Sequence, residues 1–251
     1  MSLGNRARGP FDSAQGRLKA ARATCEAARA TCGACSIIFR SMNNSGKLPF
    51  ASSSRVVKRT RGYLPHWEQE GGMYFLTFHL GDSLPAEVRE RIARRKAILE
   101  AARRSGRKLV PMESVLEREL SSRKIEEYLD AGYGECILRR TECAALVAEA
   151  LRFFEGRRYE FEAWCIMPNH VHAVFRTMEG RGLAEIVKTW KSVTSRRINA
   201  VLSRRGRLWQ PEYYDHLIRD EAELEAAVEY VRKNPERAGL VGWPWVYVKK
   251  R

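Results

Sequence analysis

Histidine is scarce in this sequence, which has five among 251 residues. Long apolar runs are absent too: none approaches the ~18 residues that a membrane helix needs. The N-terminal arginines are not followed by a continuous apolar segment, which argues against a secretory signal. We therefore expect a chain without membrane contact, located in the cytoplasm.

The six cysteines form no disulfide framework or complete zinc motif. Cys25, Cys32 and Cys35 lie near the N-terminus, and "TCGAC" has the spacing of half a zinc site. Neither a second pair nor a histidine follows at the usual distance. Free thiols in a reducing compartment are the favoured interpretation, and the role of these three cysteines stays open.

Positive charge is plentiful and unevenly spread. The formal net charge is +15, and residues 1–62 contribute 12 basic and 2 acidic side chains to it. Such an excess favours a polyanionic partner, although a solvated tail explains it equally well. With "NNSG" and "SSS" in the same region, the sequence predicts a basic, poorly ordered extension over 1–62 and a folded domain over 63–251.

Hydrophobic periodicity in 63–251 predicts an α+β domain. Alternating patterns indicate strands, and helices are bounded by proline, glycine or capping residues. The strands are expected at 73–80, 158–167, 170–177 and within 209–220, and the helices at 85–106, 114–132, 141–156, 182–203 and 221–234. This is the βαββαβ order of a ferredoxin-like antiparallel sheet with helices on one face, followed by a C-terminal helix.

Two of the five histidines stand together in "WCIMPNHVHAVF". His170 and His172 share one face of the predicted strand, whereas Val171 points the other way into the core. Two imidazoles on one face can bind a divalent metal, but a third ligand is required. On this motif alone, locally hydrogen-bonded histidines are the favoured interpretation.

The last predicted helix, with "EYVRKNP", offers the missing groups. Tyr230 and Asn234 are four residues apart, so they lie on one helical face. An amide oxygen suits Mg²⁺ or Mn²⁺, and a phenol can act as a covalent nucleophile. The spacing leaves simpler roles open: a semi-buried aromatic for Tyr230, and a C-cap before proline for Asn234.

"MPNHVHAVF", "LWQPEYYDHLIRDEAELEAAVEYVRKNPERAGLV" and "WPW" occur in this order and resemble the REP-associated tyrosine transposases. These are relatives of the single-tyrosine insertion-sequence transposases in the HUH superfamily. The resemblance covers about 63–248 and is loose over 94–135, which it implies to be a helical insertion. It implies that His170, His172 and Asn234 bind Mg²⁺ or Mn²⁺, and that Tyr230 is the nucleophile on the C-terminal helix.

The resemblance also implies a function and partners. It implies nicking and strand transfer on single-stranded DNA with hairpins, through a 5′-phosphotyrosine intermediate, by a monomer or a homodimer. Expected DNA-contacting residues follow the histidine motif: Lys188, Lys191, Arg196, Arg197, Trp209, Tyr214, His216 and Arg219. Two alternatives remain open, a domesticated hairpin-binding protein that does not cut and a ferredoxin-like RNA-processing nuclease.

Overall fold

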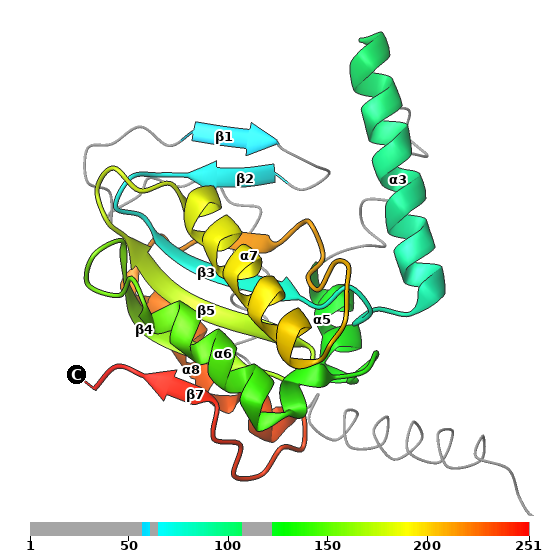
Figure 1. Ribbon diagram of the computed structural model, residues 1–251. Helices are drawn as coiled ribbons and strands as arrows, with labels where there is room; N and C mark the ends of the chain where they lie inside the picture. Colours follow the sequence, from blue (N-terminus) through cyan, green and yellow to red (C-terminus); the bar gives the residue numbers. More distant parts are fainter. Residues whose placement is uncertain (1–56, 61–64, 107–121, 251) are drawn as a thin grey trace, which may run out of the picture.

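An antiparallel sheet of five strands forms the centre of the computed structural model, which describes residues 57–60, 65–106 and 122–250 (Figure 1). Its strands, in chain order, are β3 (Met73–His79), β4 (Tyr159–Ile166), β5 (His170–Thr177), β6 (Tyr214–Leu217) and β7 (Val246–Val248). In space the order is β6-β3-β5-β4-β7, and every neighbouring pair is antiparallel. Without the short edge strand β7, this is the expected ferredoxin-like arrangement.

Two helices cover one face of the sheet and a third covers the other (Figure 1). Helices α6 (Thr141–Arg152) and α7 (Leu183–Val201) pack on the first face, where Trp190 and Val171 belong to the larger core cluster. Helix α8 (Glu221–Arg237) packs on the second face, where Val231 and Phe75 belong to a smaller cluster. The two faces follow from the alternation of side chains along each strand.

Three helices of the described residues lie between β3 and α6 in the sequence. They are α3 (Ala86–Ser105), α5 (Ser122–Asp130) and the short 3₁₀ helix η2 (Ile137–Arg139). Leu84 and Val88, at the start of α3, pack against Leu129 of α5. The rest of α3 stands away from the sheet (Figure 1). Residues 107–121, which include the first part of the helix expected at 114–132, lie outside the described residues.

A small hairpin of β1 (Val57–Thr60) and β2 (Pro65–Glu68) precedes the sheet. This pairing joins residues on both sides of the boundary expected at 62/63. Residues 57–60, on the N-terminal side of that boundary, therefore pair with residues of the expected folded domain. Residues 1–56, with the three N-terminal cysteines, lie outside the described residues.

Helix α8 does not end where the sequence predicted. Asp220 is its N-cap and accepts a hydrogen bond from the Glu223 backbone N–H at 2.8 Å. The helix continues past Pro235 to Arg237, and Ala238 is the C-cap. A proline ends a helix only if the lost hydrogen bond is not offset by packing, and Pro235 is buried here. Asn234 is therefore an interior helical residue, and its expected alternative role as a C-cap is wrong.

Candidate active site

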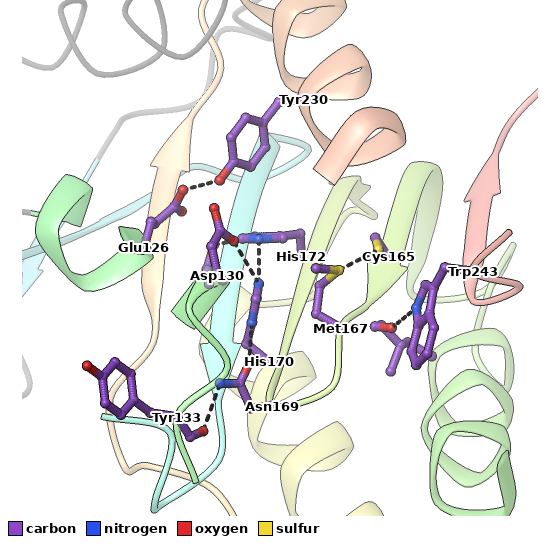
Figure 2. A network of polar contacts seen from close by, with 12 residues as sticks. Glu126, Asp130, Tyr133, Cys165, Met167, Asn169, His170, His172, Tyr230 and Trp243 are labelled. Carbon is purple, nitrogen blue, oxygen red and sulfur yellow. Dashed lines mark hydrogen bonds and ion pairs between the residues drawn. The ribbon is translucent and has the colours of Figure 1, made fainter. Parts of the chain in front are cut away.

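The histidine pair lies on the α8 face of β5, with both side chains fully buried. Their Nε2 atoms are 2.9 Å apart (Figure 2). Val171 projects to the opposite face, into the cluster shared with α6 and α7. The alternation of β5 therefore directs both imidazoles at one point, as the sequence predicted.

The outer ring nitrogens are held by polar side chains. Asn169 donates from its amide nitrogen to the Tyr133 carbonyl at 3.0 Å, so its amide oxygen accepts from His170 Nδ1 at 2.7 Å. That bond leaves Nε2 of neutral His170 with a lone pair. Thr77 Oγ1 bonds His172 Nδ1 at 2.8 Å, and when the hydroxyl accepts this bond from Nδ1, Nε2 of His172 keeps a lone pair for the shared point.

Burial keeps both imidazoles uncharged. It lowers the pKa of His170 well below its usual range, with a further contribution from His172 and His79. Burial and the positive Arg237 lower the pKa of His172 to about 3. Neutral imidazole is the form that binds a metal.

Tyr230 extends from α8 towards His172 and is 3% exposed. The two rings meet edge to face with centroids 5.4 Å apart, and the Arg237 guanidinium lies 5.0 Å from the tyrosine ring. The phenol donates a hydrogen bond to the Glu126 carboxylate (Figure 2). Burial, Glu126 and Asp130 together raise the pKa of Tyr230 well above its usual value. The nucleophile candidate and the histidine pair therefore meet within one chain.

Asn234 follows Tyr230 by one helical turn and is fully buried. Neither polar atom of its amide has a hydrogen-bond partner among the described residues. The amide is nevertheless close enough to Asp130 to lower the pKa of that carboxyl. Because a buried amide without partners is costly, this one is expected to serve a ligand.

Two carboxylates of α5 complete the site and were not anticipated from the sequence. Asp130 Oδ1 lies 4.0 Å from His170 Nε2, and Glu126 contacts the Tyr230 hydroxyl (Figure 2). Burial and the neighbouring Asp130 raise the pKa of Glu126 to about 8, and burial raises that of Asp130 to about 6. No local motif connects "KIEEYLD" to His170 and Tyr230, which follow Asp130 by 40 residues and Glu126 by 104, so only the fold reveals these contacts.

These residues fit a divalent cation of the magnesium or manganese type. Two imidazole nitrogens 2.9 Å apart can both bind an ion about 2.1 Å from each. The amide oxygen of Asn234 adds the hard ligand that such ions prefer. Within the described ranges, no group of three or more His, Cys, Asp or Glu side chains is placed to hold a metal. A site of three ligands here therefore requires the Asn234 amide beside the two histidines.

The basic residues of α7 lie away from this site. Because α7 covers the opposite face of the sheet, Lys188 and Arg196 are exposed on the side away from the histidines. Arg197 pairs with Glu149 of α6 at 2.8 Å. Lys191 donates to the carbonyls of Pro211 and Glu212. The local pattern did not show which face α7 covers, and DNA contact by these four cations stays a prediction.

Two of the other expected DNA contacts have core roles. Trp209 is 3% exposed and donates to Thr194 Oγ1 at 2.8 Å, so its side chain is part of the core. His216 is buried against Glu223, 3.3 Å away, and DNA contact by these two residues stays a prediction. Tyr214 and Arg219 are half-buried, and Tyr214 lies against Phe75 on the site's face.

Comparison with known proteins confirms the resemblance inferred from the motifs. The family described as "Transposase IS200 like" matches residues 140–234. A REP-associated tyrosine transposase of Escherichia coli (strain K12) is 27% identical over 112 residues, which are 43% of this chain and 66% of that protein. A relative from Haemophilus influenzae is 29% identical over 103 residues, 35% of this chain and 58% of its own length. The chain thus spans less than two thirds of either relative.

A solved structure of a REP-associated tyrosine transposase bound to a REP hairpin is also similar. It has a TM-score of 0.43 and 16% identity, over 76% of this chain and 81% of that one. In the part of the chain that the structure describes, no helix has the length and apolar character to cross a membrane.

Proposed function

We propose that this relative of the REP-associated tyrosine transposases nicks single-stranded DNA beside a hairpin and transfers the strand, using Tyr230 as its nucleophile. The observation that carries the proposal is the meeting of Tyr230 with the buried histidine pair, their rings 5.4 Å apart. A tyrosine nucleophile beside neutral histidines that can bind a metal ion is the arrangement required to form a phosphotyrosine intermediate. The named relatives favour a DNA substrate.

In the proposed reaction, one phosphorus–oxygen bond forms as another breaks, and each site residue has a separate role. The Tyr230 oxygen bonds to phosphorus, the bond from phosphorus to the 3′ oxygen breaks, and a 5′-phosphotyrosine and a 3′-hydroxyl result. His170, His172 and Asn234 would hold Mg²⁺ or Mn²⁺, which supplies charge neutralisation at the phosphate. Arg237, over the tyrosine ring, adds positive charge beside the forming bond. Since a 3′-hydroxyl can reverse the step, no energy source is required.

The test is transfer of an end-labelled hairpin oligonucleotide to the protein. We expect a covalent adduct with Mg²⁺ or Mn²⁺, no adduct after chelation, and no adduct with Tyr230→Phe. Tyr247→Phe is the matched control, because that ring stacks on Trp164 away from the site and should leave the adduct unchanged. An adduct that survives Tyr230→Phe would refute the assignment.

Metal binding is measured separately, by Mn²⁺ titration with paramagnetic resonance detection. His172→Ala and Asn234→Ala should each weaken Mn²⁺ binding by more than the roughly 10–100-fold that loss of a hydrogen-bond partner of a ligand costs. Hairpin binding without an adduct under any metal condition would favour the non-cutting alternative. Metal-independent RNA cleavage would favour the RNA-nuclease alternative.

A further inference from the structure

Helix α5 contributes directly to the candidate active site, although it lies outside the family match at 140–234. Its Glu126 side chain is 7% exposed and accepts the hydrogen bond of the Tyr230 phenol (Figure 2). A phenol must lose its proton as it attacks phosphorus, so its hydrogen-bond acceptor is the first group to consider as the base.

We propose that Glu126 is a catalytic residue that takes the proton of Tyr230 during attack; this rests on the proposed function. As the tyrosine oxygen bonds to phosphorus, its O–H bond breaks and the proton passes to the Glu126 carboxylate. The electron pair of the broken phosphorus–oxygen bond stays on the 3′ oxygen, which takes a proton from solvent. When a 3′-hydroxyl reverses the step, Glu126 returns the proton to the tyrosine.

The other polar groups around the phenol are less suited to this role. Arg237 lies over the ring and is a cation, so it cannot accept a proton. His172 meets the ring edge to face, but its Nδ1 bonds Thr77 and its Nε2 faces His170. Asp130 points to His170 Nε2. Among the described residues, Glu126 is the carboxylate recorded in hydrogen-bond contact with the reacting oxygen.

The position of Glu126 is built into the fold. Leu129, on the same helix, is buried against Leu84 and Val88 of the preceding segment. The chain after α5 is tied to the histidine turn, because Asn169 donates to the Tyr133 carbonyl at 3.0 Å. A catalytic base needs such support from its surroundings to keep its geometry.

The test combines Glu126→Gln with a more acidic nucleophile. Glutamine keeps the size and can still accept the hydrogen bond, but it cannot take the proton at this position. We expect adduct formation to slow by about 10²–10⁴-fold, the usual contribution of a general base. A ring-fluorinated tyrosine at position 230, whose phenol loses its proton more easily, should restore much of the rate in Glu126→Gln. In the otherwise unchanged protein it should have little effect.

Glu127→Gln is the matched control, because this neighbouring carboxylate on α5 is exposed. Its rate should equal that of the unchanged protein. Circular dichroism and thermal unfolding check that Glu126→Gln is folded. Should it not fold, Glu126→Asp replaces it, with a carboxylate set back by one methylene and a rate loss that the fluorinated tyrosine again relieves.

Three results would overturn the inference: an unchanged rate in Glu126→Gln, a slow rate that fluorination does not relieve, or a faster rate. The last would mean that α5 restrains Tyr230. Each of these leaves the proposed function standing, because the unchanged protein still forms the adduct. Absence of any adduct in the unchanged protein would instead reject the proposed function itself.

Discussion

Asn234 is the residue that the fold itself explains least. Its side chain is fully buried, and neither polar atom of its amide has a hydrogen-bond partner among the described residues. Burial of an unsatisfied polar group costs about 1–3 kcal/mol. Active sites commonly carry such costs, because the group is needed for a ligand and not for folding.

This reasoning predicts opposite effects of Asn234→Leu on stability and on metal binding. In the presence of a chelator, the variant should be more stable by about 1 kcal/mol, because leucine has a similar volume and no polar atoms to satisfy. Urea unfolding measures that change, and the Mn²⁺ titration should show weaker binding by the same protein. A variant that is clearly less stable without metal would show that the amide has a structural role.

Among the elements, the β1–β2 hairpin contacts the sheet through a buried histidine, and the Trp67 backbone N–H also donates to Asp215 at 3.3 Å. His66 of β2 contacts the Asp215 carboxylate of β6 through Nδ1, and its Nε2 lies 3.7 Å from Glu212. Burial disfavours the charged imidazole, but Asp215 and Glu212 outweigh this and raise the pKa of His66 to about 9. The hairpin is therefore held by a histidine that stays protonated at neutral pH.

The raised pKa gives a definite pH dependence. The stabilisation by His66 should be complete below its unfolded pKa of about 6.5 and should be lost as pH rises through about 9. We expect the difference in unfolding free energy between the unchanged protein and His66→Gln to be largest near pH 6 and to shrink towards pH 10. The protection of β1 and β2 amides, expressed relative to the intrinsic exchange rate at each pH, should fall over the same interval. A constant difference would contradict the assignment.

Local patterns were sufficient for some elements and insufficient for others. Strands β4 and β5 lie within a residue of the expected ranges, because strict alternation around a tight "PN" turn is a local signal. Strand β7 was not anticipated, since its three residues are set by pairing with β4. The position of α5 depends on the contact between Glu126 and Tyr230, which are 104 residues apart. The face that α7 covers depends on how the whole sheet is assembled. The sequence therefore predicted His170, His172 and Tyr230 as a group, but missed Glu126 and Asp130 and did not show which face of the sheet α7 covers.

At the scale of the whole molecule, one chain supplies every residue of the candidate site. The nucleophile comes from α8, which packs on β4, β5 and β7 of its own sheet. Exchange of α8 between two copies would first expose its buried residues, including Leu224 and Val231. Each such side chain contributes about 1.5–3 kcal/mol when buried, so detachment of α8 is slow, and within one chain Tyr230 already meets His172. A single copy is therefore expected to be catalytically complete.

Mixing two inactive variants tests this expectation. His172→Ala keeps the tyrosine but lacks a metal ligand, and Tyr230→Phe keeps the histidines but lacks the nucleophile. If each chain uses its own tyrosine, equal amounts of the two should form no more adduct than either alone, even at high concentration. If Tyr230 served the histidines of a second copy, the mixture would contain one intact site and the adduct would return. Addition of the unchanged protein to either variant provides the positive control, and sedimentation at the assay concentration shows whether mixed dimers were present to be tested.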